Sequence, residues 1–306
     1  MGCAPETPYV RTTIEQAVTD LNADLSSKKP SLEYFRVMTH FDLSERQQIN
    51  REYSAKYGDL AADLAHFPLL LNYLAVNYFE DRITLWAKSI HNAMDGLGTN
   101  EHELIWLILL QSTDTKQLVE EKYTELFNEN LSQRVHQETN TQNWAKLIRC
   151  KLRNKNEMEV DVNEMADRID RAANAMLADS ACFINLLCKV EPHCYREVIQ
   201  RYQEEYENFE GVLKKEFFGN TEYAFLLMND WLINPVTAVA RLINRFIEGI
   251  GTMDQQLCLC TLLFSDRYKK GLIRTAYKKY GNMAEDVKFD TLLYGKAVLI
   301  MWGLEE

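Results

Sequence analysis

The sequence predicts an all-α protein built from four repeats of about five helices each. Three observations lead to this prediction: turn-forming residues are scarce, helix-forming residues are plentiful, and one pattern recurs along the chain. Among 306 residues there are 12 glycines and 6 prolines, too few for the many tight turns of a β-sandwich or β-barrel. Leu, Ala, Glu, Lys, Met and Gln are abundant, and these residues favour helices. A hydrophobic fraction of 46% allows a sizeable core,.

The recurring pattern is a tyrosine followed, three or four residues later, by a second aromatic residue. The four copies are Tyr53 with Tyr57, Tyr123 with Phe127, Tyr202 with Tyr206, and Tyr277 with Tyr280. Their first tyrosines lie 70, 79 and 75 residues apart. A spacing of four places both rings on one helix face, where we expect them to pack inward. A near-constant period of this kind indicates a duplication.

The period divides the chain into a short N-terminal segment, residues 1–8, and four repeats, residues 9–80, 81–158, 159–232 and 233–306. Typical helices and connections leave room for about five helices in each repeat. In the second repeat, the apolar run 104–110 should lie on a buried central helix that begins near Asn100. Periodicity alone would also allow a buried strand, but the polar helical flanks favour a helix. The run 257–264 is its counterpart in the fourth repeat, behind a capping box of Thr252 and Gln255.

Charge and composition exclude several classes of protein. The net charge is −11, whereas a nucleic-acid-binding protein is normally basic. An acidic chain is also repelled by anionic lipid, so membrane binding would need a bound divalent cation to reverse the sign locally. No apolar run reaches the length of a membrane span. The first residues lack a basic stretch followed by an apolar one, so we expect no secretory signal.

The seven cysteines include no Cys-x-x-Cys pair. A zinc site built from them is therefore not expected. We expect reduced, mostly buried thiols in a cytosolic protein.

Two repeats carry a glycine loop just before their buried helix. One loop is residues 94–99, Met-Asp-Gly-Leu-Gly-Thr, and the other is residues 247–252, Ile-Glu-Gly-Ile-Gly-Thr. By itself, Gly-x-Gly usually marks a helix end and a turn, because glycine accepts positive φ without steric cost. It is not a dinucleotide-binding motif, since no third glycine follows and helices rather than a strand flank it.

An acidic residue about 40 positions later gives these loops a chemical meaning. Glu138 follows Gly98 by 40 residues, and Asp290 follows Gly251 by 39. Calcium takes about six to eight oxygen ligands, including carbonyls and often a bidentate carboxylate. A glycine loop can turn several carbonyls toward one point, and a carboxylate from the next inter-helix loop can complete the shell. The predicted ligand sets are Met94, Gly96 and Gly98 with Glu138, and Ile247, Gly249 and Gly251 with Asp290.

These features together resemble the annexin family: Gly-x-Gly-Thr, a later acid, and a fourfold repeat of roughly 75 residues. The resemblance covers nearly the whole chain, from about residue 8 to the end. It implies a curved disc of four five-helix repeats, with Ca²⁺ held in loops on the convex face. It also implies calcium-dependent binding to acidic, phosphatidylserine-like phospholipid membranes. Leu97 and Ile250, at the loop tips, either contact the membrane interface or pack against neighbouring loops.

The other two repeats depart from the family pattern. In the first, residues 26–30 contain no glycine, and the acidic position falls near His66. In the third, residues 177–181 replace the glycines, and Glu216 at the acidic position is expected to be a solvated charge. We therefore expect both sites to be lost. These losses and the short N-terminal segment resemble the alpha-giardins, divergent protist annexins linked to membrane and flagellar cytoskeleton.

Other functions compete with this interpretation. The chain has no His-Glu-x-x-His, P-loop or Gly-x-Ser-x-Gly motif, so we do not expect an enzyme, and His136 should be a surface residue. A calcium-independent helical scaffold of the cytoskeleton is the main alternative. A basic run (Lys146, Arg149, Lys151, Arg153 and Lys155) and a basic helical stripe (Arg267, Lys270, Arg274 and Lys278) could hold sulfated glycans, although solvated helix faces explain them more simply,.

The expected location is the cytoplasm, peripheral to the inner face of the plasma membrane, with flagella and cytoskeleton as a further possibility. Acylation of Gly2 and Cys3 would strengthen membrane anchoring. Glu6 stands where the acylation motif has Ser or Thr, which argues against it,.

Overall fold

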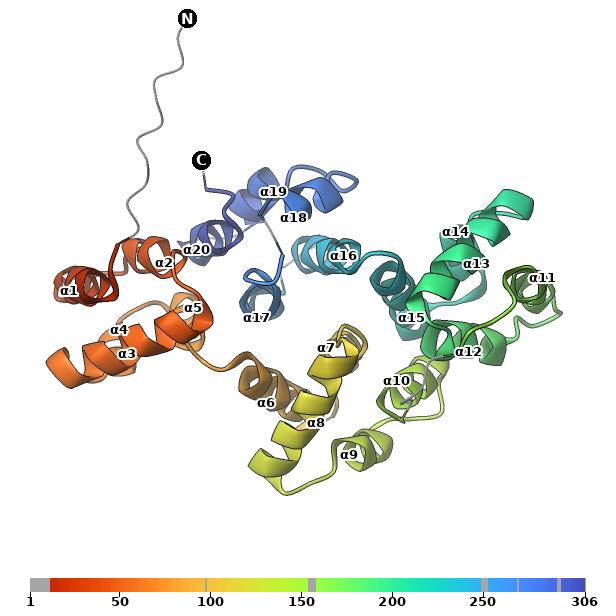
Figure 1. The fold of residues 1–306 in the computed structure, drawn as a ribbon, viewed down its shortest axis with the longest axis horizontal. Helices are drawn as coiled ribbons and strands as arrows, with labels where there is room; N and C mark the ends of the chain where they lie inside the picture. Colours follow the sequence, from red (N-terminus) through yellow and green to blue (C-terminus); the bar gives the residue numbers. More distant parts are fainter. Residues whose placement is uncertain are drawn as a thin grey trace, which may run out of the picture. The chain divides into compact units, whose positions relative to one another are not determined.

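A computed structural model of the chain describes residues 12–96, 98–153, 158–248, 253–268, 270–290 and 293–305, with the side chains of 270, 289 and 290 left out. Within these ranges the chain forms twenty helices and no strand, apart from one isolated bridge between Met158 and Val190. The predicted all-α class is confirmed (Figure 1). None of the described helices is both long and apolar enough to cross a membrane.

The helices fall into four successive groups of five, as the repeats predict. The first group is α1 (Ile14–Leu25), α2 (Glu33–Met38), α3 (Leu43–Tyr57), α4 (Leu60–Leu64) and α5 (Leu69–Asn77). The second is α6 (Arg82–Met94), α7 (Glu101–Leu109), α8 (Thr113–Phe127), α9 (Leu131–Glu138) and α10 (Asn143–Arg153). The third is α11 (Val162–Ala173), α12 (Ser180–Lys189), α13 (Pro192–Glu205), α14 (Phe209–Glu216) and α15 (Gly219–Ile233). The fourth is α16 (Pro235–Ile247), α17 (Asp254–Phe264), α18 (Lys270–Tyr277), α19 (Met283–Asp290) and α20 (Leu293–Trp302).

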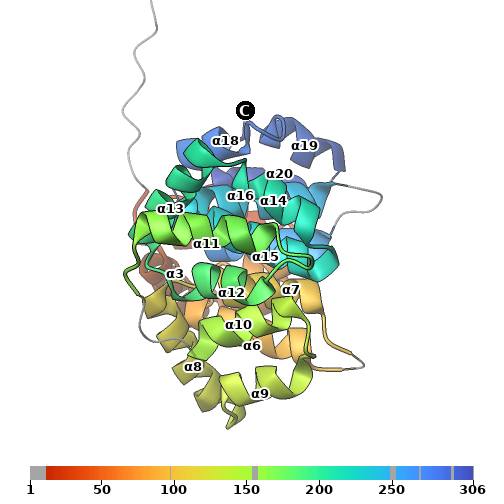
Figure 2. The same cartoon turned by 90° about the vertical axis from the view of Figure 1, so that its right-hand side faces the viewer.

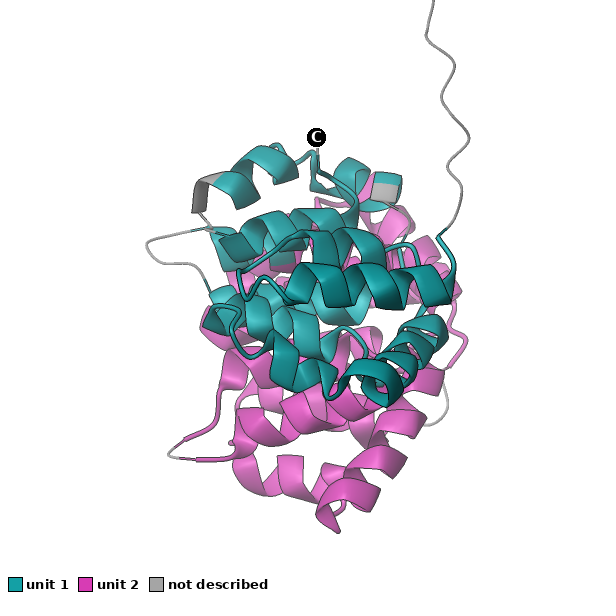
Figure 3. Cartoon of the chain, turned by 90° about the vertical axis from the view of Figure 1, so that its left-hand side faces the viewer, with its two compact units in different colours: residues 1–81, 243–306 teal, residues 82–242 magenta. Residues whose placement is uncertain are grey.

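The chain forms two compact units (Figure 3). Unit 1 joins residues 1–81 to residues 243–306, so the first and fourth groups pack together although they are farthest apart in sequence. Within it, α5 packs against α17 and α20. Unit 2 spans residues 82–242, and there α7 packs against α10 and α15.

The predicted buried helices are confirmed. Residues 104–110, on and just after α7, are fully buried, and residues 257–264 of α17 are buried as well. The capping box predicted for α17 is wrong, because Met253 is the N-cap residue and makes no side-chain cap. Thr252 lies outside the described residues.

The four aromatic pairs form, with ring centroids 4.9–5.7 Å apart. The first tyrosine of each pair is buried. The expectation that both rings pack inward is wrong for Tyr57 and Tyr206, which are more than a third exposed. Each follows its buried partner at or just beyond the end of a long helix.

The expectation of uniformly reduced thiols is also corrected. Cys150 of α10 and Cys188 of α12 form a disulfide, with their Cα atoms 6.2 Å apart. This spacing lies in the range that a disulfide spans. The bond becomes feasible because α10 packs against α12, a contact between two repeats that residue spacing does not reveal. The described free cysteines, 182, 194, 258 and 260, are buried as expected.

A buried arginine connects the first and fourth groups of unit 1. The guanidinium of Arg46 is fully buried and lies 4.0 Å from the ring centroid of Tyr78. It donates to the backbone carbonyl of Phe41 at 3.1 Å and forms a two-pronged ion pair with Asp266. Arg36 and Glu305 form a second ion pair between the same groups, but both of these side chains are exposed.

These two ion pairs should differ in their effect on stability. We expect Arg46→Leu to lower the free energy of unfolding by about 2–4 kcal/mol, because it removes buried hydrogen bonds and the contact with Tyr78. The matched variant Arg36→Leu should cost less than about 1 kcal/mol, since its pair is exposed to solvent. Urea unfolding followed by circular dichroism measures both, and equal effects would contradict an anchoring role for Arg46.

Candidate metal centre

The loop between α6 and α7 is closed by a backbone hydrogen bond. The N–H of Asn100 donates to the carbonyl of Ala93 at 2.8 Å. The Asn100 side chain then caps α7 by accepting from the N–H of Glu103 at 3.2 Å. Together these bonds hold the end of α6 and the start of α7 at the base of a short loop.

Within this loop, the two glycines are required by their backbone conformation. Gly96 has φ +113° and Gly98 has φ +95°, values that side-chain-bearing residues rarely adopt. No atom lies within 4 Å of where a Cβ would sit at either position, so crowding is not the reason for glycine. The N–H of Gly98 donates to the carbonyl of Gly96 at 3.2 Å. Leu97, the predicted tip residue, lies outside the described residues.

The predicted carboxylate lies against this loop. Glu138 is the last residue of α9, and its Oε2 accepts from the Thr99 hydroxyl at 3.3 Å. The same hydroxyl is 3.4 Å from the Glu138 backbone carbonyl. Met94, whose carbonyl is the first predicted ligand, ends α6, where carbonyls have no partner within their own helix,.

Arg134 holds the other carboxylate oxygen of Glu138. Its Nη2 lies 3.1 Å from Oε1, one helical turn earlier on α9, and both side chains are about a quarter exposed. Arg134 was not among the predicted site residues, although its spacing of four residues from Glu138 was a usable signal. A carboxylate at a helix C-terminus opposes the helix dipole, so a nearby cation is needed to stabilise it.

Several negative charges lie near the loop and make the electrostatic potential there negative. Burial raises the pKa of Tyr123 to about 12, and the negative charges of Glu129, Glu138 and Asp95 add to the rise, whereas Arg134 opposes it. Tyr123 lies on α8, and its hydroxyl is 3.2 Å from Nδ1 of His91 on α6. This potential favours binding of a cation near the loop.

Known proteins share this fold. No family model matches the chain. Annexin E1 of Giardia intestinalis is 25% identical over 305 residues, covering 95% of this chain and 89% of that protein. Among solved structures, calcium-bound alpha-14 giardin has a TM-score of 0.85 at 21% identity, covering 96% of this chain and 98% of its own. Chicken annexin V has a TM-score of 0.83 at 20% identity, covering 97% and 98%.

The chain has the annexin fold and is similar over nearly its whole length to annexins and alpha-giardins. Its structural neighbours include alpha-giardins as well as annexins.

In the fourth repeat, the same backbone closure is present. The N–H of Met253 donates to the carbonyl of Phe246 at 2.9 Å, and these residues are seven apart, like Ala93 and Asn100. Ile247 ends α16 and is buried. Asp290 ends α19, a helix of eight residues like α9. Gly249, Ile250, Gly251 and the side chain of Asp290 lie outside the described residues.

The third repeat has the closure but a different loop conformation. The N–H of Asp179 donates to the carbonyl of Ala172 at 3.0 Å. Counting from this bond, Ala175 and Leu177 occupy the positions of Gly96 and Gly98. The predicted equivalence of residues 177–181 to the glycine loop is therefore shifted by two residues. Neither Ala175 nor Leu177 has positive φ, so the backbone does not present its carbonyls as in the second repeat.

Glu216 still ends α14, as Glu138 ends α9. It forms an ion pair of 3.2 Å with the neighbouring Lys215.

The α11–α12 loop carries two apolar side chains that are exposed to solvent, since Met176 is 99% and Leu177 84% exposed. In unit 2, the α6–α7 and α11–α12 connections lie on the same side (right in Figure 2).

In the first repeat, an imidazole takes the place of the carboxylate. The helix α4 has five residues, and His66 follows it. The ring nitrogens of His66 lie 2.6 Å from the Asp63 carbonyl and 3.2 Å from the Lys29 carbonyl. A ring nitrogen of His66 therefore faces the loop, where a carboxylate and a cation would otherwise meet. His66 stands at the expected position, but its contact with the Lys29 carbonyl was not predicted from the sequence.

The predicted basic stripe around α18 is only partly helical. Arg267 and Lys278 lie outside α18, so the four cations do not share one helix face. On α10, Arg149 turns toward Thr139, with Nη1 3.4 Å from its hydroxyl, and burial together with Arg153 lowers the pKa of Arg149. Lys155 lies outside the described residues.

The contact made by His66 should stabilise the first repeat without metal. We expect His66→Ala to lower the free energy of unfolding by about 1 kcal/mol in the presence of a calcium chelator, because the ring's hydrogen bonds are lost. His136→Ala, which carries no such contact in the described residues, should change it by less than about 0.5 kcal/mol. Urea unfolding measures both, and equal values would contradict a structural role for His66.

Proposed function

We propose that this annexin-like protein binds acidic phospholipid membranes through calcium held between the α6–α7 loop and Glu138. The contact between Thr99 and the Glu138 carboxylate carries the proposal, because it brings the acid to the loop that would supply carbonyls. A second site in the fourth repeat would use Ile247, Gly249 and Gly251 with Asp290. The calcium bound to alpha-14 giardin and alpha-1 giardin supports this chemistry.

Each site would be weak until lipid completes it. One carboxylate and neutral carbonyls supply a single formal negative charge, which suggests a dissociation constant of about 10⁻⁴–10⁻³ M in isolation. Open coordination positions remain for water or for a phosphate oxygen of the lipid. Lipid would then raise calcium affinity, and calcium would raise lipid affinity by the same factor. Bound calcium would thus offset the repulsion between anionic lipid and a chain of net charge −11,.

Calcium binding would replace existing contacts of Glu138. Without metal, one carboxylate oxygen faces Arg134 and the other faces Thr99. A bidentate calcium ligand uses both oxygens, so the ion must displace both partners. Arg134 therefore competes with calcium, both as an ion-pair partner and as a nearby positive charge.

Apolar loop tips would add contact with the membrane interface. Leu97 and Ile250 hold the tip positions of the two glycine loops, and the equivalent loop of the third repeat exposes Met176 and Leu177. Moving side chains of this kind from water into the interfacial region lowers the free energy. The corresponding location is the cytoplasmic face of the plasma membrane.

A calcium-independent scaffold is the second candidate, favoured by the loss of ligands in two of the four loops. Such a protein would engage cytoskeletal filaments or sulfated glycans through basic surfaces such as that of α10. The two functions are compatible, since a membrane-docked protein can also link filaments.

Sedimentation with phosphatidylserine liposomes tests the membrane proposal. We expect pelleting with calcium and release by chelator. Glu138→Gln should raise the calcium concentration needed for half-maximal pelleting by about tenfold or more, equivalent to about 1.4 kcal/mol or more. Adding Asp290→Asn should abolish pelleting, because neither proposed site then has its carboxylate.

Glu216→Gln is the matched control, since it removes the equivalent acid of the third repeat and should leave pelleting unchanged. Liposomes of neutral phosphatidylcholine control for lipid charge. No pelleting at millimolar calcium would overturn the proposal in favour of the scaffold.

Arg134→Gln should strengthen calcium binding. Removing the competing ion pair, worth roughly 0.5–1 kcal/mol at this exposure, corresponds to about a two- to five-fold gain in affinity. Isothermal titration with calcium, in the presence of a soluble short-chain phosphatidylserine, measures the effect. An unchanged or weaker affinity would show that Glu138 is not released from Arg134 when calcium binds.

A further inference from the structure

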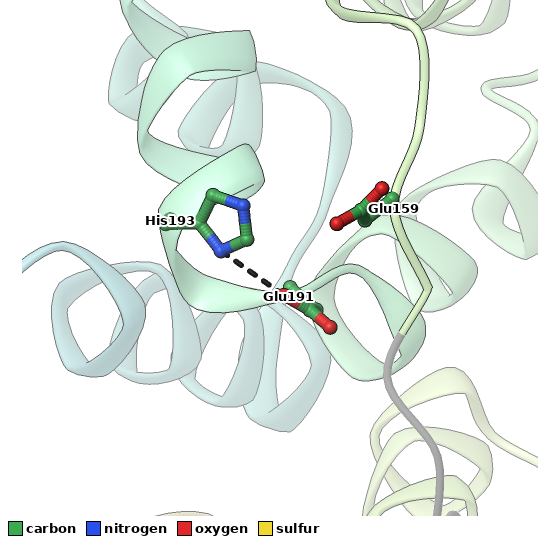
Figure 4. A group of neighbouring side chains, drawn as sticks. All are labelled: Glu159, Glu191 and His193. Carbon is green, nitrogen blue, oxygen red and sulfur yellow. Dashed lines mark ion pairs between the residues drawn. The ribbon is translucent and has the colours of Figure 1, made fainter.

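Away from the calcium loops, unit 2 gathers two carboxylates and an imidazole (Figure 4). Ligand atoms of Glu159, Glu191 and His193 all lie within 4.8 Å of one another. Glu159 belongs to the connection between α10 and α11, whereas Glu191 and His193 lie at the start of α13. None of the three belongs to a predicted calcium site.

Backbone hydrogen bonds hold the two segments together. The N–H of Met158 donates to the carbonyl of Lys189 at 2.6 Å, and the N–H of Glu191 donates to the carbonyl of Met158 at 3.1 Å. This isolated bridge places Glu159 beside Glu191 without any contribution from their side chains. The donor groups are thus brought together before any ligand binds, which lowers the entropy cost of binding.

The imidazole is oriented as a ligand. Nδ1 of His193 lies 3.0 Å from Oε2 of Glu191, toward the carboxylates. Nε2 lies 3.2 Å from the sulfur of Cys194, which is buried. A metal-bound histidine normally uses its second nitrogen to donate to a neighbouring group, which fixes the ring. Cys194 can accept such a bond as a weak sulfur acceptor.

The charges at this cluster are incompletely balanced. The Glu159 carboxylate forms no hydrogen bond or ion pair with the residues that the structure describes, and it faces a second carboxylate. His193 can compensate for one negative charge when protonated, and a divalent cation would compensate for both.

We propose that Glu159, Glu191 and His193 bind a divalent transition metal, with zinc as its representative. An imidazole nitrogen with two carboxylate oxygens suits zinc and its neighbours, whereas calcium takes oxygen ligands. Zinc bonds near 2.1 Å place tetrahedral ligand atoms about 3.4 Å apart. The pair His193–Glu191 is already within that distance, and Glu159 needs only a modest side-chain movement. A fourth position would remain for water.

Bound metal would tie the connection between the second and third repeats to α13. The site would respond to a different ion from the membrane-binding loops, and it does not depend on the proposed membrane function. Loss of liposome pelleting in the Glu138 variant therefore says nothing about this site.

Cobalt titration of the full chain, stripped of metals, tests the proposal. Co²⁺ is a spectroscopic substitute for zinc, and we expect visible d–d absorption that saturates at one equivalent, without a thiolate-to-cobalt band. Zinc should displace the cobalt and remove this absorption, whereas excess calcium should not. Glu159→Gln and His193→Gln should each weaken binding by about tenfold or more, in line with loss of a ligand.

His136→Gln and Glu216→Gln are matched controls. Each removes one histidine or one carboxylate, as the test variants do, but away from the cluster, so both should leave the spectrum unchanged. Circular dichroism verifies folding, and Glu159 is an exposed residue whose substitution leaves the core intact. An unchanged cobalt affinity in His193→Gln, a thiolate-to-cobalt band, or no binding at millimolar cobalt would each overturn the proposal.

Discussion

The backbone hydrogen bond that closes the loop between the first two helices of a repeat is the constraint on which the proposed calcium site depends. It joins Ala93 to Asn100, Ala172 to Asp179 and Phe246 to Met253, each pair seven residues apart. Because it uses only main-chain groups, it fixes where the second helix begins whatever side chains the loop carries. The frame of the site can therefore persist in a repeat that has lost its ligands, as the third repeat demonstrates.

The residues of each loop decide which way its carbonyls point, and the residue opposite the loop decides which charge lies near those carbonyls. Positive φ at Gly96 and Gly98 re-orients the peptide units of the second repeat, at a cost of about 1–3 kcal/mol for most other residues. The third repeat avoids that conformation and exposes Met176 instead. The first repeat replaces the acid by His66, whose ring contacts a loop carbonyl directly. The first two loops therefore differ in what lies against them: the Glu138 carboxylate in the second repeat and the His66 imidazole in the first.

Sequence patterns were sufficient for features that depend on local periodicity. The buried helix α7, the four aromatic pairs and the place of Glu138 beside its loop all follow from spacing along one chain segment or one repeat period. Features that depend on packing between repeats did not follow. The disulfide between Cys150 and Cys188 requires the contact of α10 with α12. The two-residue shift in the third repeat became visible only through the bond between Ala172 and Asp179, because without glycines the sequence offers no marker of register.

The acids at the ends of the fourth helices are held by side-chain cations that the proposed calcium ion would have to replace. Glu138 ends α9 and Glu216 ends α14, where the helix dipole opposes a carboxylate. Each is stabilised by a side-chain cation, Arg134 or Lys215. Exposed pairs of this kind contribute little, roughly 0–1 kcal/mol, so they are easily exchanged for a stronger cation. Lys215 pairs with Glu216, and the loop of that repeat lacks the positive-φ conformation of the glycine loop. Replacing Lys215 by a metal ion there would therefore add no carbonyl ligands. Arg134 faces the one described acid that also contacts a glycine loop, so replacing it by calcium adds carbonyl ligands that an arginine cannot use.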